Sequence, residues 1–141
     1  PTRELACQIE KEAVSLGRAA GIRSCCLYGG VELRSQVEAL RRKPQLIVAC
    51  PGRLLDLSDR RKAALGEVGF LVLDEADRML DMGFSEAVIA IVGRLVEPSC
   101  RQTVMFTATW PRRVEELAAG MTRRPVQVRQ GEAREASCNV R

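Results

Sequence analysis

The feature that most constrains this chain is a short apolar run, residues 70–73, that leads directly into the acids Asp74, Glu75 and Asp77. Such a run is typical of a strand that is buried on both faces, as in a parallel sheet. Carboxylates at its end lose favourable hydration unless a cation meets them. In open α/β sheets, ligands bind just beyond the carboxyl ends of the strands. The acids therefore indicate either a magnesium-nucleotide site or a solvated acidic turn.

Short apolar runs alternate along the chain with segments of helical periodicity. The apolar runs predict strands at 22–28, 46–50, 70–73, 102–106 and 126–128. Apolar residues at helical spacing predict helices at 5–16, 33–43, 51–57, 85–95 and 111–121. This alternation predicts an α/β fold in which one parallel sheet is covered by helices on both faces.

Single residues predict several helix boundaries. Gly21 is a plausible stop for the first helix. Residues 79–84 are expected to form a turn, after which Ser85 caps the next helix. Pro111 suits the first position of the last helix, because its missing N–H is not needed there.

Chemically distinctive residues follow four of the predicted strands. Right-handed crossovers place the carboxyl ends of parallel strands along one edge, so we expect 29–30, 50–53, 74–77 and 107–109 to share that edge. Asp74 can hold Mg²⁺, directly or through water, and Glu75 can orient or deprotonate a water molecule. Thr107 and Thr109 are placed to hydrogen-bond Asp77.

Phosphate groups suit other parts of the same edge. The segments Pro1-Thr2-Arg3, Gly29-Gly30 and Cys50-Pro51-Gly52-Arg53 precede or open predicted helices. Backbone N–H groups at helix starts bind anions, and glycine lets a backbone come close. The alternative is that Arg3 and Arg53 are ordinary surface cations and that Gly29 serves only a turn.

Composition excludes several classes of site. The 141 residues include no histidine, which removes His-based triads and general bases. Six cysteines lack C-x-x-C spacing, so a zinc site is not expected and a reducing, intracellular compartment is. No apolar run reaches the roughly 20 residues of a membrane span. The net charge of +4 mildly favours a polyanionic partner.

Five motifs, taken in order, resemble those of DEAD-box RNA helicases. They are Pro1-Thr2-Arg3-Glu4-Leu5-Ala6 (motif Ia), Gly29-Gly30 (motif GG), Pro51-Gly52-Arg53 (motif Ib), Asp74-Glu75-Ala76-Asp77 (motif II) and Thr107-Ala108-Thr109 (motif III). The tetrapeptide Asp-Glu-Ala-Asp alone would be weak, but five motifs in the family's order are specific. The resemblance covers about residues 1–130.

The resemblance implies an incomplete RecA-like domain of the P-loop NTPase type at 1–130. Residues 131–141 would be a linker toward a missing second RecA-like domain. It implies ATP-dependent RNA remodelling, with ATP and Mg²⁺ as cofactors, protein cofactors as possible partners and a nuclear or cytoplasmic location. Asp74 and Glu75 would serve Mg²⁺-ATP and hydrolysis, and Asp77, Thr107 and Thr109 would couple hydrolysis to RNA release.

The resemblance assigns the remaining motif residues to RNA. Contacts with the sugar-phosphate backbone, independent of sequence, would come from Pro1, Thr2, Arg3, Gly30, Cys50, Gly52 and Arg53. One of these departs from the family pattern, since Cys50 stands where motif Ib usually has threonine. A thiol is a weak hydrogen-bond partner, so we predict a loss of about 1 kcal/mol in helix capping or phosphate contact.

A second departure concerns the phosphate loop. The 141 residues contain no G-x-x-x-x-G-K-[ST] sequence and no Gly-Lys pair. We therefore expect this polypeptide by itself to lack measurable ATPase activity. The main interpretation is a fragment of an ATP-dependent RNA helicase. The alternative is a truncated, non-catalytic module that binds RNA or a protein partner, and a DNA helicase or chromatin remodeller is disfavoured by the residues that follow motifs II and III.

Overall fold

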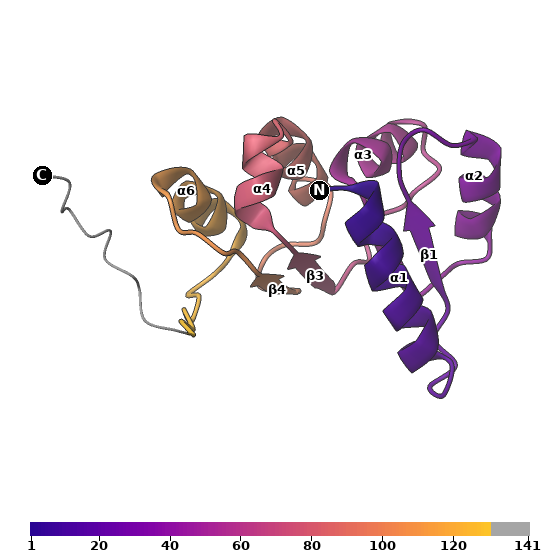
Figure 1. Ribbon diagram of the computed structural model, residues 1–141, viewed down its shortest axis with the longest axis horizontal. Coiled ribbons are helices and arrows are strands. Elements are labelled where there is room, and N and C mark those ends of the chain that lie inside the picture. The colour runs from indigo at the N-terminus through magenta and orange to yellow at the C-terminus, as the bar shows by residue number, and fades with distance from the viewer. Residues whose placement is uncertain (131–141) are drawn as a thin grey trace, which may run out of the picture.

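The computed structural model describes residues 1–130, which form six helices and four strands that alternate except where α4 and α5 follow each other (Figure 1). The helices are α1 (Arg3–Gly17), α2 (Leu33–Arg41), α3 (Pro51–Asp59), α4 (Ala76–Asp81), α5 (Ser85–Val92) and α6 (Arg112–Met121). The strands are β1 (Ser24–Leu27), β2 (Leu46–Ala49), β3 (Phe70–Leu73) and β4 (Gln102–Met105). The predicted linker at 131–141 lies outside the described residues.

All strand pairing in the described residues is parallel, which confirms the predicted α/β class. The strands form two two-stranded sheets, β1–β2 and β3–β4, rather than the single sheet expected. Leu27 pairs with Ala49 in the first sheet, and Leu73 pairs with Met105 in the second. A single sheet does not form, because no strand of one pair hydrogen-bonds to a strand of the other and no further described strand lies between the pairs.

Each strand pair has its own apolar core. Leu73 belongs to a cluster with buried residues of α4, α5 and α6, such as Leu80 and Val114. Leu27 belongs to a second cluster with Leu57 of α3. Ile91 of α5 is buried in this second cluster, and α3 packs against α5. These contacts join the two halves of the molecule that Figure 1 shows side by side.

The prediction that residues 70–73 are buried on both faces is wrong. Leu73 is buried, but the side chains of Phe70 and Val72 are 55% and 46% exposed. Alternate residues of a strand point to opposite faces. The helices α4, α5 and α6 cover the face that carries Leu73, and no element of residues 1–130 buries the other.

The structure corrects other predicted boundaries. Residues 76–81, expected to be loop and turn, form α4. Ser85 is the first residue of α5 and Phe84 is its N-cap, while Pro111 is the N-cap of α6 rather than its first residue. The first helix ends at Gly17, before a turn that contains Gly21 at φ +67°.

The strand predicted at 126–128 is absent from the described chain. Val126 and Val128 are 89% and 87% exposed. A strand needs a neighbour for its backbone hydrogen bonds, and no described strand pairs with these residues.

In residues 1–130, no helix combines the length and apolarity that crossing a bilayer requires.

The described cysteines are free thiols. Burial raises the pKa of Cys25 to about 11 and that of Cys26 to about 12. Cys25 is buried in the cluster around Leu27, as expected for a thiol that packs as a small hydrophobe.

Candidate nucleotide and RNA sites

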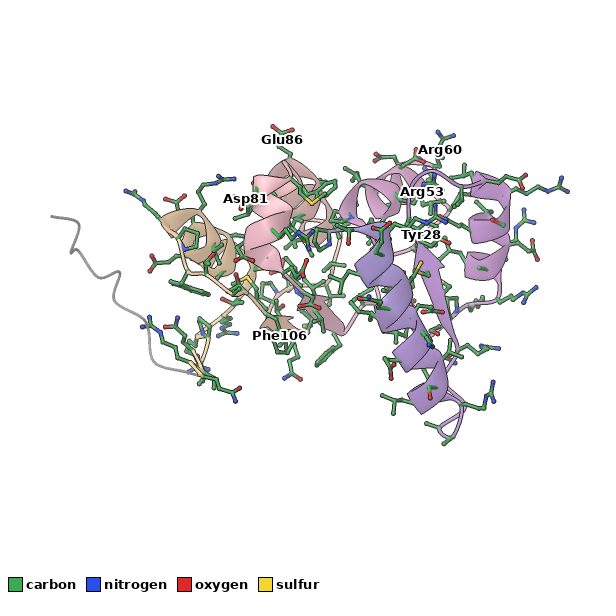
Figure 2. All side chains as sticks on the ribbon, in the orientation of Figure 1. Tyr28, Arg53, Arg60, Asp81, Glu86 and Phe106 are labelled. Carbon is green, nitrogen blue, oxygen red and sulfur yellow. The ribbon has the colours of Figure 1, made fainter. Side chains whose placement is uncertain are left out.

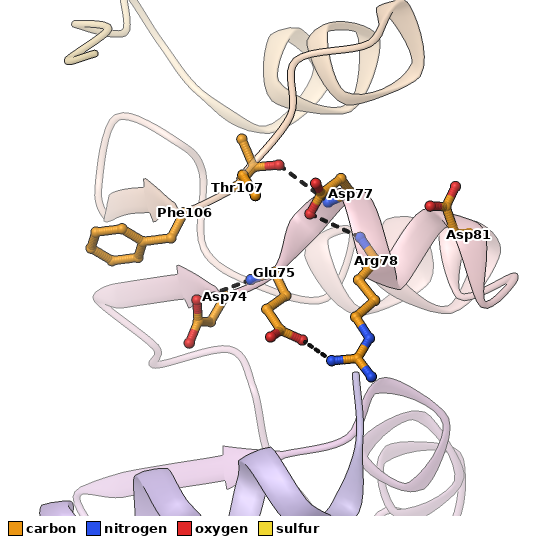
Figure 3. Close-up of a pocket in the computed structure, with 8 residues that line it drawn as sticks. Asp74, Glu75, Asp77, Arg78, Asp81, Phe106 and Thr107 are labelled. Atoms are coloured by element: carbon orange, nitrogen blue, oxygen red, sulfur yellow. Dashed lines mark hydrogen bonds and ion pairs between the residues drawn. The ribbon is translucent and has the colours of Figure 1, made fainter. Parts of the chain in front are cut away.

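The carboxyl ends of β3 and β4 border an open hollow of about 540 Å³ (Figure 3). Its lining residues come from the acidic turn, from α4 and from the segment after β4: Asp74, Glu75, Asp77, Arg78, Asp81, Phe106, Thr107 and Ala108. Four of the five predicted catalytic residues therefore line one hollow. The fifth, Thr109, reaches it through a hydrogen bond to Asp77.

Backbone hydrogen bonds hold the two strand ends together. Phe106 N–H donates to the carbonyl of Leu73 at 2.8 Å, and Ala76 N–H donates to the carbonyl of Phe106 at 3.0 Å. Between them, Glu75 adopts the left-handed conformation at φ 53° and ψ 51°. A non-glycine residue there costs about 1–3 kcal/mol and is enriched at functional sites. This turn carries the chain sharply from β3 into α4.

Asp74 and Glu75 differ in their partners. The Oδ1 atom of Asp74 accepts a hydrogen bond from the N–H of Glu75 at 3.0 Å. Glu75 Oε2 pairs with Nη1 of Arg78 at 3.0 Å, one turn along α4 (Figure 3). Both of these side chains are substantially exposed, at 36% and 57%, and exposed ion pairs are weak. Arg78 therefore orients Glu75 without removing it from solvent.

Asp77 joins the two strand ends through side-chain hydrogen bonds, as predicted. Its Oδ2 atom accepts from the hydroxyl of Thr109 at 2.6 Å and from the N–H of Thr109 at 3.0 Å. Thr107 Oγ1 accepts from the N–H of Asp77 at 3.3 Å and donates to the carbonyl of Thr109 at 2.8 Å. The hydroxyl of Thr109 is the main cause that lowers the pKa of Asp77.

The acidic end of β3 fits magnesium that arrives with phosphate. Among residues 1–130, no group of three or more acidic or cysteine side chains is arranged to hold a metal by itself. Mg²⁺ in nucleotide enzymes keeps several waters and takes one or two carboxylates together with substrate phosphates. The only hydrogen bond to the Asp74 carboxylate from the described chain is to Oδ1, so this group would hold such an ion.

A second hollow, of about 320 Å³, lies beyond the carboxyl ends of β1 and β2. Gly29, Cys50, Gly52, Arg53, Asp56 and Phe84 line it. Three predicted RNA-binding residues, Cys50, Gly52 and Arg53, therefore share one hollow. Gly30 is the residue after Gly29 of this lining and has φ +77°, which glycine adopts without strain. Pro1, Thr2 and Arg3 do not line this hollow.

Two predicted RNA-binding residues are helix N-caps with different outcomes. Thr2 caps α1, because its Oγ1 accepts from the N–H of Leu5 at 3.3 Å. Cys50 is the N-cap of α3 and makes no side-chain capping bond. The missing bond is what a thiol at this position leads us to expect, while the loss of about 1 kcal/mol in helix capping or phosphate contact stays a prediction. Pro1, beside Thr2, is buried.

Both predicted RNA-binding arginines contact other parts of the chain. The guanidinium of Arg3 lies 4.9 Å from the centre of the Tyr28 ring. Arg53 donates through Nη1 to Gln36 Oε1 at 3.1 Å and through Nη2 to the carbonyl of Val31 at 3.3 Å. Neither is an isolated surface cation, and Figure 2 shows Tyr28 and Arg53 in the same half of the molecule.

Sequence reasoning missed Gln36, which is only 5% exposed and lies beneath the second hollow's arginine. The signal was present, because Gln36 interrupts the apolar positions Leu33, Val37 and Leu40 of α2. A polar residue within such a stripe is buried and therefore needs hydrogen-bond partners. Arg78, which pairs with Glu75, has no role in the sequence-based assignment either.

Comparison with known proteins gives the same assignment as the motifs. A family model, DEAD/DEAH box helicase, matches residues 1–117. The match includes the acidic turn, the hydroxyl segment after β4 and most of α6.

The chain belongs to the DEAD/DEAH box helicase family.

Curated relatives agree along the whole chain. The ATP-dependent RNA helicase DBP3 of Kluyveromyces lactis is 52% identical over 141 residues, which are 100% of this chain and 28% of that protein. DEAD-box ATP-dependent RNA helicase 14 of Arabidopsis thaliana is 48% identical over 139 residues, 99% of this chain and 22% of that protein. The chain thus spans less than a third of the length of these relatives.

A solved structure confirms the RecA-like helicase fold. The crystal structure of a hypothetical ATP-dependent RNA helicase from Sulfolobus tokodaii superposes with a TM-score of 0.79 at 32% sequence identity. The match covers 86% of this chain and 36% of that one. The chain is therefore an incomplete α/β domain of this fold.

Proposed function

We propose that the protein carrying this chain is an ATP-dependent RNA helicase, which couples hydrolysis of Mg²⁺-ATP to remodelling of RNA. The observation that carries the proposal is the hydrogen-bonded link between Asp77 and Thr109. This link joins the acidic turn after β3 to the hydroxyl segment after β4. A change in the acidic turn on hydrolysis would therefore be transmitted directly to a second segment of the domain.

The acidic turn would supply the residues for hydrolysis. Asp74 would hold the metal, and Glu75 would orient or deprotonate the attacking water. Arg78 orients the Glu75 carboxylate through an ion pair of 3.0 Å. When bound, ATP would supply the phosphoanhydride bond that is hydrolysed, and Mg²⁺ would neutralise part of the charge on its phosphates. Asp77, Thr107 and Thr109 would couple that step to RNA release.

RNA would bind beyond the ends of β1 and β2. Thr2, Arg3, Gly30, Gly52 and Arg53 would meet its sugar-phosphate backbone, with Pro1 and Cys50 beside them. Contacts of this kind set position and affinity but do not read sequence. We further propose that the protein acts in the nucleus or cytoplasm and that it has protein cofactors as partners.

The test is RNA-stimulated ATP hydrolysis by the purified natural full-length protein that contains this chain. We expect a basal rate that rises on addition of RNA, together with unwinding of a short duplex. A protein that binds RNA but hydrolyses no ATP would overturn the proposal. That result would favour the alternative of a non-catalytic binding module.

A further inference from the structure

We propose that Gln36 is a positioning residue of the RNA-binding face, which holds Arg53 and the Gly29-Gly30 segment in the geometry that binds the RNA backbone. This inference rests on the proposed function. Gln36 does not line the second hollow, and among the lining residues it hydrogen-bonds only Arg53 within residues 1–130, so we infer that it acts through other residues rather than on RNA itself.

The amide of Gln36 connects the end of β1 to the first turn of α3. Its Nε2 donates to the carbonyl of Tyr28 at 3.0 Å, and its Oε1 accepts from Nη1 of Arg53 at 3.1 Å. Only this orientation of the amide satisfies both neighbours, because the guanidinium can only donate and the carbonyl can only accept. The side chain thus makes two specific bonds while 5% exposed.

Arg53 is held at a second point in the same segment. Its Nη2 donates to the carbonyl of Val31 at 3.3 Å. Guanidinium groups carry five N–H donors in a planar fork, so these two bonds fix the plane and leave donors for the hollow that Arg53 lines. The guanidinium of Arg53 therefore links α3 to the segment 28–31, and its remaining N–H donors keep a fixed orientation at the hollow.

The segment between these anchors needs such support. Gly29 and Gly30 have no side chains to pack, and a Cβ built on either would meet no atom within 4 Å. Glycine gives up the most conformational freedom on ordering, and a flexible phosphate site loses affinity to that cost. The bonds at Tyr28 and Val31 flank the two glycines and restrict them before RNA arrives.

The first test is RNA affinity, measured by fluorescence anisotropy with a single-stranded RNA, in the natural full-length protein. Gln36→Leu removes both hydrogen bonds, and we expect binding to weaken about three- to tenfold. Ser35→Ala is the matched control on the same helix, because within residues 1–130 the Ser35 hydroxyl bonds only the carbonyl of Glu32. We expect no change there. Unaltered affinity of Gln36→Leu would overturn the inference.

A double-mutant cycle separates positioning from general destabilisation. Because Gln36 acts in part through Arg53, Gln36→Leu should cost less affinity in the Arg53→Ala background than it costs in the wild-type protein. Losses that simply multiply would overturn the inference and leave the proposed function standing. A loss in Gln36→Leu with none in Arg53→Ala would also overturn it. If neither variant loses affinity, the inference and the RNA assignment of this face both fail.

A second variant keeps the inference testable if Gln36→Leu does not fold. Arg53→Lys retains the charge but not the fork that reaches Gln36 and Val31 together, so we expect affinity close to that of Arg53→Ala. Arg41→Lys is its control, on the helix that carries Gln36, since Arg41 pairs with Glu38 at the exposed surface. Full affinity in Arg53→Lys would show that charge alone matters, and the inference would fall.

Discussion

The two parallel strand pairs use different side chains to hold together the segments that follow their strands. In each pair these segments lie at one edge, beyond the carboxyl ends of the strands. After β3 and β4, the carboxylate of Asp77 bonds Thr109 directly, in reach of solvent. After β1 and β2, a buried neutral amide, Gln36, bonds the carbonyl of Tyr28 and the guanidinium of Arg53.

The difference suits the ligand that we propose for each edge. A magnesium-nucleotide site needs carboxylates at the surface, where they remain ionised and reach the metal. A phosphate-backbone site needs amide and guanidinium donors facing outward. The second edge is held by the neutral side chain of Gln36, although one carboxylate, that of Asp56, lines its hollow. A neutral holding group adds no further negative charge there.

The largest effect should come from Glu75, which distinguishes a catalytic edge from a merely acidic one. Glu75→Gln keeps the shape but removes the base, so we expect ATP hydrolysis to fall by about 10²–10⁴-fold. RNA affinity, which we assign to the other edge, should stay within about twofold. Steady-state hydrolysis assays check this, with Glu86→Gln at the start of α5 as the control. Normal turnover in Glu75→Gln would refute the catalytic assignment.

The next effect tests the link at the catalytic edge. Thr109→Val deletes the 2.6 Å hydrogen bond to Asp77 but keeps the side-chain volume. A bond of this kind contributes about 1 kcal/mol, so we expect RNA stimulation of hydrolysis to fall about fivefold. The ratio of rates with and without RNA measures it. Thr122→Val, where the hydroxyl donates to the carbonyl of Ala118 one turn back in α6, should leave the ratio unchanged. Equal ratios in both variants would contradict the coupling role.

A gain is expected at the other edge. Cys50→Thr would supply the capping oxygen that α3 lacks. A threonine cap contributes about 1 kcal/mol, which corresponds to about fivefold tighter RNA binding if the capped helix contacts phosphate. Affinity measured across a salt titration checks this, with Cys100→Thr at an exposed site as the control. Unchanged affinity would show that the helix start does not contact RNA.

The smallest effect is on pH dependence. Hydrogen bonds from Thr109 lower the pKa of Asp77, so their contribution to stability is present above the ordinary carboxyl pKa. That contribution is lost as the pH falls through the lowered value. We expect Thr109→Val to raise the pKa of Asp77, followed by NMR of its carboxyl carbon. Thr122→Val should give the wild-type titration, and an equal titration in Thr109→Val would assign the shift to another cause.

Much of the fold was predictable from sequence because the periodic signals were strong. All four apolar positions of α6 expected from spacing, Val114, Leu117, Ala118 and Met121, are buried. The prediction failed where a neighbour decides the outcome. Phe70 and Val72 have strand character, but whether their outer face is covered depends on another element, and the same holds for the strand expected at 126–128.

Candidate site residues were predictable where they carry their own chemistry. Asp77 and Thr109 lie 32 positions apart, yet both follow apolar strands, so parallel topology was enough to bring them together. Gln36 was missed because its role comes from its neighbours. A glutamine has no characteristic reactivity, and only its burial beside Tyr28 and Arg53 reveals what it holds.

The sequence by itself determined the order of the four strands that form, the family and the identity of the acids and hydroxyls at the strand ends. These follow from local periodicity and residue chemistry, which do not depend on distant contacts. Only the tertiary structure decided which strands pair, which face of β3 stays exposed and which side chains hold each edge. Those outcomes depend on contacts between residues distant in sequence, because hydrogen bonds and burial are properties of pairs rather than of single positions.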